Sequence, residues 1–237
     1  MSVDHAANLQ ALLTRIAPAP ESVQPRPEFE LSPGDPMTDP VCQELVWSYL
    51  VWEAGEKRAR ALAGKLCESF VDLNEFRVCL PSELASFFGS TYPKAAERGD
   101  RMRATLNDIY NREHAVTLLT LSSMNKRDAK TYLDSLEGIP PYVAARTFLI
   151  GLGGHAFPLD DRLLKLLTKE EALAESGDVL AAMGWLERQI RSGDAAPALV
   201  ALEAHSESPS AKKSAPRKPA SRTSKKATTR TRKSSKS

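Results

Sequence analysis

Two short stretches, residues 136–146 and 157–161, hold the groups of this chain that could support chemistry. In the first stretch, Gly138 lies in a turn between two segments with helical spacing of apolar residues. The start of a helix carries free N–H groups and partial positive charge, which suits a phosphate. In the second stretch, Asp160 and Asp161 begin a further helix. The pattern predicts an anion-binding turn with a carboxylate beside it, although Asp at a helix start is most often only a cap.

Helices must position these groups, because apolar residues recur at helical spacing and no alternating run is bounded by hairpin turns. We therefore expect an all-α chain of roughly ten short helices. Asp39 and Pro40 form a strong helix start, and the mostly apolar helix after them is predicted to be central. The predicted helices span residues 6–16, 40–54, 56–70, 73–79, 82–88, 94–112, 126–136, 141–152, 162–167, 178–191 and 195–204.

Charge and composition divide the chain into three parts. Residues 210–237 hold 11 of the 32 Lys and Arg and no acidic residue, which leaves 21 basic against 30 acidic residues, a net charge of −9, in residues 1–209. The tail has no large aliphatic or aromatic residue and is predicted to be disordered. We expect an N-terminal helix with a Pro-rich wrap (1–38), a helical body (39–207) and a basic tail (208–237).

Some classes of protein are excluded by composition. Three cysteines without a CxxC pair indicate a reducing compartment and no disulfide framework. No apolar run approaches the ~20 residues of a membrane span, and the N-terminus lacks a signal peptide. We expect a cytoplasmic protein without a membrane partner, associated with the nucleoid, or nuclear in a eukaryote.

The two stretches resemble the signature of the endonuclease III family of helix-hairpin-helix DNA glycosylases. In that family the hairpin reads roughly Leu-Pro-Gly-Val-Gly-x-Lys-Thr-Ala, and the loop after it reads Val-Asp-Thr. With Gly138 on the first hairpin glycine, Tyr142 falls at the catalytic-lysine position and Asp160 on the catalytic aspartate, without a gap. The resemblance extends more loosely over residues 39–207. It implies a two-lobed, all-α fold that binds double-stranded DNA, and we expect a monomer.

The chain departs from the family at three places. The catalytic lysine is absent, and Tyr142 in its place is similar to the branch that acts on mismatched thymine or uracil and only cleaves the glycosidic bond. Pro140 replaces the second hairpin glycine, and because proline has no N–H, one donor to a phosphate is lost. The family's iron–sulfur loop needs four cysteines after the last helix. The cysteines here are Cys42, Cys67 and Cys79, so we expect no cluster and no other cofactor or metal.

The resemblance implies a mechanism in which the target base is flipped into a pocket between the lobes. Asp160 would stabilise the oxocarbenium-like sugar or orient the attacking water, and Tyr142 would line the pocket. Glu53 lies near the position from which the family inserts a polar side chain into the DNA, and a carboxylate there would face phosphates. The alternative is that Asp160 only caps its helix and Tyr142 packs in the hairpin.

Eleven tail cations predict a strong, salt-sensitive affinity for DNA of any sequence. Three functions stay open: a monofunctional base-excising enzyme, a catalytically inactive DNA-binding module tethered to the chromosome by its tail, and a protein-interaction domain that the tail localises. The predicted DNA-binding residues are Gly138 and Ile139 in the turn, with Lys212, Lys213, Arg217, Lys218, Arg222, Lys225, Lys226, Arg230, Arg232 and Lys233 in the tail.

Overall fold

The computed structural model describes residues 3–17, 39–175 and 177–208, and over these residues it is built from helices without a strand. The predicted all-α class is confirmed. The tail from residue 209 and the Pro-rich stretch 18–38 lie outside the described residues, and the boundaries at 38 and 207 stay predictions. The α-helices are α1 (His5–Ile16), α2 (Pro40–Val51), α3 (Glu56–Ser69), α4 (Leu73–Val78), α5 (Pro81–Phe88), α6 (Ala95–Glu113), α7 (Lys126–Asp134), α8 (Pro141–Arg146), α9 (Asp161–Lys169), α10 (Val179–Gln189) and α11 (Ser192–Glu207), with a 3₁₀ turn at Leu119–Ser123 and a π-helical turn at Thr147–Gly151.

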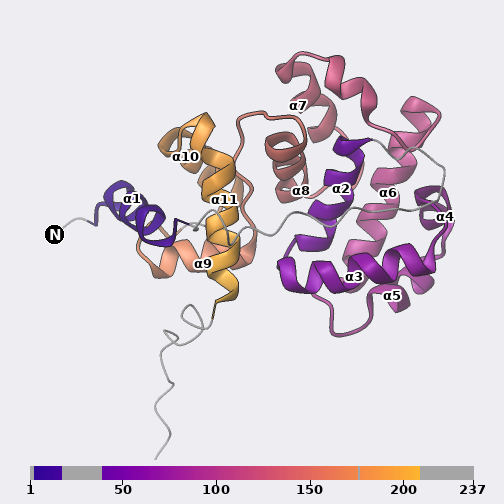
Figure 1. Ribbon diagram of the computed structural model, residues 1–237, viewed down its shortest axis with the longest axis horizontal. Helices are drawn as coiled ribbons and strands as arrows, with labels where there is room; N and C mark the ends of the chain where they lie inside the picture. Colours follow the sequence, from indigo (N-terminus) through magenta and orange to yellow (C-terminus); the bar gives the residue numbers. More distant parts are fainter. Residues whose placement is uncertain (1–2, 18–38, 176, 209–237) are drawn as a thin grey trace, which may run out of the picture.

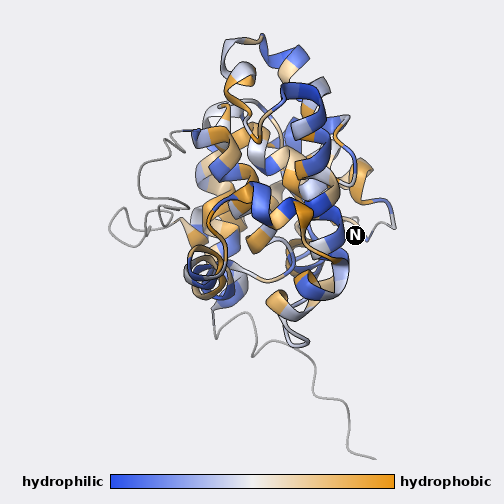
Figure 2. Ribbon diagram, turned by 90° about the vertical axis from the view of Figure 1, so that its right-hand side faces the viewer, coloured by the Kyte–Doolittle hydropathy of each residue, from blue (hydrophilic) through white to orange (hydrophobic). Residues whose placement is uncertain are grey.

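The helices form two lobes (Figure 1). The larger lobe contains α2 to α8, and the smaller lobe contains α1, α9, α10 and α11, so the chain begins and ends its helical part in the same lobe. In the smaller lobe, α1 packs on α11, and Leu9 and Leu12 of α1 are buried. Polar and apolar residues both occur along most helices (Figure 2), as amphipathic helices with one buried face require.

The central position predicted for α2 is confirmed, since ten of its residues are buried. Asp39 caps its first turn: Oδ1 accepts hydrogen bonds from the N–H groups of Val41 and Cys42. The helix ends at Val51, earlier than predicted, because the backbone then turns through positive φ at Glu53 (58°) and Gly55 (84°). We call residues 52–55 the α2–α3 turn, and it faces the start of α9.

The predicted turn at Gly138 is present between α7 and α8, and we call residues 135–140 the α7–α8 turn. Gly138 has φ 74°, a value that L side chains rarely adopt. A Cβ there would also lie 3.0 Å from Ala104 Cβ and 3.0 Å from the Arg101 carbonyl oxygen. Only glycine therefore allows the turn to pack this closely on α6.

Within residues 3–17, 39–175 and 177–208, no helix combines the length and the apolar character that crossing a membrane requires.

Candidate active site between the lobes

Asp160 is the N-cap residue of α9, and its carboxylate is fully engaged. Oδ1 accepts a hydrogen bond from the Leu163 N–H at 3.0 Å, and Oδ2 accepts one from the Glu53 N–H at 2.9 Å. Arg162 adds an ion pair to Oδ2 at 3.0 Å through its Nε. The side chain is 0% exposed. Asp160 thus does more than cap its own helix, because it also holds the α2–α3 turn, but no oxygen of its carboxylate faces solvent.

Glu53 completes a reciprocal pair with the start of α9. Its N–H donates to Asp160, and its Oε1 accepts the N–H of Asp161 at 3.1 Å. Partial burial, followed by the nearby Asp160 carboxylate, raises the pKa of Glu53. Two acidic side chains therefore lie together at the place where the family resemblance would put a DNA backbone.

The raised pKa of Glu53 predicts an effect of pH on stability. A carboxyl whose pKa is raised by folding is destabilising when it is ionised, so the penalty is absent below its unfolded pKa of about 4.3 and grows as pH rises through the folded pKa. Glu53→Gln keeps the acceptor for Asp161 but cannot ionise. We expect thermal melts to show a higher Tm than wild type at pH 7, with the difference vanishing near pH 4. Glu68→Gln, at an exposed carboxylate of α3 without an ion-pair partner among the described residues, is the control, and an equal gain there would contradict the assignment.

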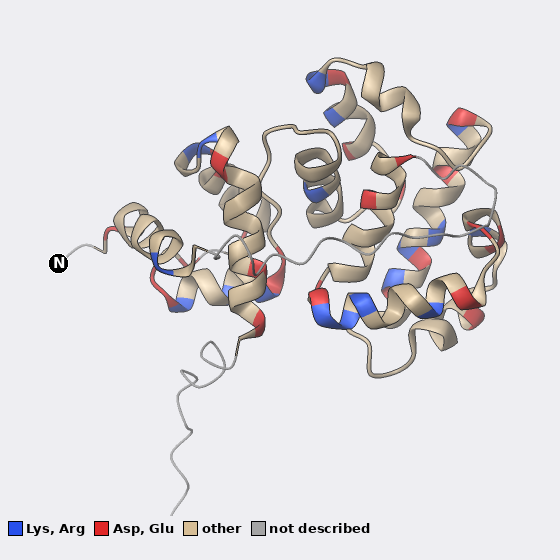
Figure 3. Ribbon diagram, viewed as in Figure 1, with Lys and Arg blue, Asp and Glu red and all other residues tan. Residues whose placement is uncertain are grey.

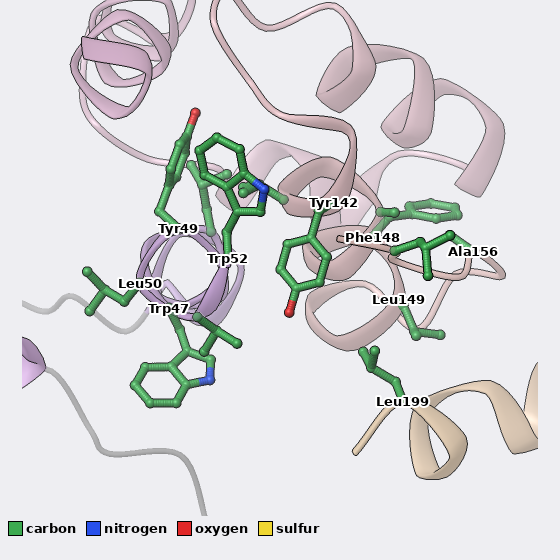
Figure 4. Close-up of a cluster of buried hydrophobic side chains, with 14 of the residues drawn as sticks. Trp47, Tyr49, Leu50, Trp52, Tyr142, Phe148, Leu149, Ala156 and Leu199 are labelled. Carbon is green, nitrogen blue, oxygen red and sulfur yellow. The ribbon is translucent and has the colours of Figure 1, made fainter. Parts of the chain in front are cut away.

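Tyr142 is buried, with 2% of its surface exposed, and its hydroxyl donates to Glu203 of α11. Figure 4 shows its ring within the apolar cluster that α2 and α8 share. Burial, followed by the Glu203 carboxylate, raises the pKa of Tyr142 well above its ordinary value. Tyr142 is therefore a neutral donor at physiological pH, and in this conformation it presents no reactive atom to solvent.

A buried charge network, which we call the Arg146 bridge, lies behind Tyr142. Arg146 Nη1 pairs with the Glu44 carboxylate of α2, and Arg146 Nε pairs with Glu203 Oε1 at 3.2 Å. The side chains are 7%, 2% and 5% exposed, respectively. Burial alone lowers the pKa of Arg146, but Glu203 and Glu44 outweigh it and the pKa is raised. The bridge joins α2, α8 and α11, so it links the two lobes.

The sequence interpretation missed these three residues. A signal was present, because Glu44 and Glu203 each lie in a mostly apolar helix and Arg146 precedes the apolar run Phe148-Leu149-Ile150. A charged residue in such a helix is rarely buried without a partner.

A second contact between the lobes caps α3. The cap position, Gly55, has no side chain, and the Glu207 carboxylate from the end of α11 accepts the N–H groups of Glu56 and, at 3.3 Å, of Lys57. A Cβ on Gly55 would overlap Glu207 Oε1. Arg162 Nη1 lies 3.9 Å from the same carboxylate. The last residue of α11 thus neutralises the start of α3, next to the α2–α3 turn.

The α7–α8 turn offers one free donor among its described N–H groups. Glu137 N–H donates to Asp108 Oδ2 at 2.9 Å, and Ile139 N–H donates to the Leu136 carbonyl at 3.3 Å. Pro140 has no N–H, so Gly138 alone in residues 137–140 has an N–H without an acceptor among the described residues. Of the predicted DNA contacts, Gly138 therefore keeps its donor and the Ile139 amide is used within the turn. The ten predicted tail residues lie outside the described residues.

Two cations that the sequence interpretation did not select lie near Trp52 of the α2–α3 turn, and one of them, Arg101, also contacts the α7–α8 turn. Arg101 Nη1 donates to the Gly138 carbonyl at 3.2 Å, and its guanidinium carbon lies 6.0 Å from the Trp52 ring centre. Lys94 Nζ lies 4.8 Å from the same ring. Both side chains are partly exposed, at 41% and 37%. Both cations pair with Glu97 of α6, at 3.7 Å for Lys94 and 2.8 Å for Arg101, and Lys94 also opposes the rise in the pKa of Glu53.

The cysteines do not fit the cluster found in the resembling family. Cys42 is buried in α2, Cys67 is in α3 and Cys79 follows α4, and the chain has no cysteine after residue 79. In the part of the chain that the structure describes, no group of three or more His, Cys, Asp or Glu side chains is placed to hold a metal ion.

Neither family models nor curated protein sequences match this chain. Solved structures do match it. A thermostable thymine-DNA glycosylase aligns with TM-score 0.53 and 13% identity over 86% of each chain. A trapped covalent intermediate of endonuclease III with DNA, an estranged-adenine complex, aligns with TM-score 0.59 and 10% identity over 84% of each chain. Together with the two helical lobes and the Gly138 and Asp160 placements, these alignments show that the chain has the all-α fold of the endonuclease III-like DNA glycosylases.

Proposed function

We propose that this protein is a monomeric, double-stranded-DNA-binding module with a glycosylase-like body whose catalytic position is closed. The observation that carries this proposal is the Asp160 carboxylate, which is 0% exposed and held by two backbone N–H groups and Arg162. An oxocarbenium-like sugar needs a carboxylate within contact distance. With its oxygens engaged inside the protein, Asp160 acts as a structural joint between α9 and the α2–α3 turn.

Three features support DNA as the partner. One solved structure with this fold is a complex with DNA. The Gly138 N–H is free for a phosphate oxygen, and Arg101 lies beside it. The tail supplies eleven cations without an acidic residue, whereas residues 1–209 carry net charge −9. The tail is therefore the main source of affinity, and the body contributes a few placed contacts.

Base excision is the second candidate, because Asp160 keeps both the helix-start position and the spacing from Gly138 that the family has. Excision by this chain requires Arg162 to release Asp160 and Tyr142 to separate from Glu203. The reaction would be monofunctional, since Tyr142 replaces the lysine and its raised pKa keeps the phenol neutral.

The test compares the full chain with a variant ending at Ser208 on undamaged, T·G, U·G and 8-oxoguanine duplexes. We expect equal affinity for all four, no alkali-sensitive sites, and a loss of affinity of tenfold or more, on the order expected for several lost phosphate contacts, on truncation at low salt. Base release that Asp160→Asn abolishes would establish excision instead. Absence of DNA binding by the full chain, with retention of a protein partner, would favour the protein-interaction function.

A further inference from the structure

An open groove of about 340 Å³ lies between α3 and the segment that joins α5 to α6. It is separate from Asp160 and Tyr142, and none of its lining residues is acidic, although residues 1–209 carry net charge −9. We call it the α3 groove. Its lining residues are Arg58, Ala61, Leu62, Lys65, Phe88, Thr91 and Tyr92.

The two cations of the α3 groove are placed on one face of α3. Arg58 is exposed and has no carboxylate partner among the described residues. Lys65 is also exposed; its ammonium donates one hydrogen bond to the Phe87 carbonyl and lies 4.8 Å from the Phe87 ring centre, which leaves two of its three N–H groups for a phosphate. They are seven positions apart, which is a rise of about 10 Å along the helix. Two cations at this separation can contact different phosphates of one duplex.

Between these two cations the exposed residues of α3 are small. Ala61 and Gly64 are exposed there, and a Cβ on Gly64 would have no atom within 4 Å. Glycine inside a helix costs about 1 kcal/mol relative to alanine, and no close packing within the described residues requires one here. The small residues allow a ligand to approach the α3 backbone between Arg58 and Lys65.

The aromatic walls favour a phosphodiester strand over unpaired bases as the occupant. Phe88 is 5% exposed, and the Tyr92 hydroxyl is fixed by donation to the Leu50 carbonyl at 2.6 Å. Base stacking needs a free aromatic face, whereas the Phe88 ring is buried and the Tyr92 ring is held in place by its hydroxyl. The exposed Thr91 supplies a hydroxyl of the kind that contacts phosphate oxygens.

We propose that the α3 groove binds the phosphodiester backbone of duplex DNA, as a second contact surface beyond the α7–α8 turn. The inference rests on the DNA binding proposed above. Lys and Arg residues occur along the α3 ribbon (Figure 3), and the helix begins at the α2–α3 turn, so a duplex at that turn can continue along it. Glu56 does not oppose this contact, because it pairs with Arg60.

The test uses the full chain and an undamaged duplex. Arg58→Glu/Lys65→Glu is compared with Arg188→Glu/Arg191→Glu, which makes the same charge change at exposed residues of the smaller lobe. We expect the first variant to lose at least tenfold more affinity than the second. Its slope of log affinity against log salt should fall by about 1.8, because each lost phosphate contact contributes about 0.9.

A charge-neutral variant separates binding from folding. Gly64→Gln is expected to raise helix stability, because glutamine has the higher helix propensity, while its side chain obstructs the strand and lowers affinity severalfold. If both charge-reversed variants lose equal affinity, or Gly64→Gln binds as wild type does, the α3 groove is not a DNA contact. If the wild-type chain binds no DNA, the proposed function itself fails. Saturation of the α3 groove by an acidic peptide without competition from DNA would also overturn the inference.

Discussion

Replacement of Arg146 by methionine is expected to destabilise the protein by about 3–5 kcal/mol, the loss typical when one partner of a buried charge group is removed. The variant removes the guanidinium that pairs with both the Glu44 and the Glu203 carboxylates, which are 2% and 5% exposed. It also leaves the Tyr142 hydroxyl bonded to an uncompensated carboxylate. The measurement is urea unfolding at pH 7, where the loss appears as a lower midpoint with an unchanged slope.

Two further variants make this result specific. Arg112→Met removes an arginine from a more exposed pair with Asp108 and is expected to cost about 1 kcal/mol or less. The triple variant Glu44→Gln/Arg146→Met/Glu203→Gln should recover much of the loss, because no net charge is then buried. The stabilising effect of the Arg146 bridge would not be electrostatic if Arg146→Met were as stable as Arg112→Met. The same would follow if the triple variant were no more stable than Arg146→Met.

Arg98→Met is expected to cost about 3 kcal/mol or more, since several buried carbonyls would lose their donor. Arg98 is fully buried and caps the end of α2: it donates to the carbonyls of Tyr49, Leu50 and Trp52, and at 2.9 Å to that of Pro93. Burial lowers its pKa to about 10, so it stays charged at neutral pH. Unfolding by urea, measured beside wild type, gives the size of the loss.

The position of Arg98 predicts a second readout. One of its carbonyl partners, Trp52, begins the α2–α3 turn, whose Glu53 N–H donates to Asp160. Loss of Arg98 should therefore loosen Asp160 as well as lower stability, and Arg98→Lys should restore little because an ammonium cannot span the same carbonyls. Full stability of the lysine variant would mean that a point charge suffices at the end of α2.

Local signals in the sequence predict the fold and the position of Asp160 well, because helix starts and tight turns are encoded within a few residues. Asp39 with Pro40, the turn at Gly138 and the start of α9 at Asp160 are all of this kind, and each is present. Such signals indicate which backbone groups need partners. They do not predict the further contacts of a capping side chain, such as those of Asp160 with Glu53 and Arg162.

Contacts between distant helices could not be predicted from one sequence. Arg146 and Glu44 are 102 residues apart, and Glu207 and Glu56 are 151 residues apart. Periodicity marks which face of a helix is buried, but not which helix covers it. The π-helical turn at Thr147–Gly151 is similar: the Gly154 N–H donates to the Phe148 carbonyl, and a Cβ on Gly154 would overlap the Phe148 ring. The helical segment therefore ends at Gly151, next to the predicted end at residue 152, but periodicity alone did not predict that its last turn is π-helical.

The Arg146 bridge also has a consequence for motion between the lobes. Many two-lobed proteins move about a hinge, which requires an interface that separates at little cost. A hinge opening that moves α11 away from α2 and α8 would separate Glu203 from Arg146, which would then pair with Glu44 alone. It would also break the hydrogen bond between the Tyr142 hydroxyl and Glu203. We therefore expect the Arg146 bridge to disfavour opening of the lobes, because separating a buried charge network is costly.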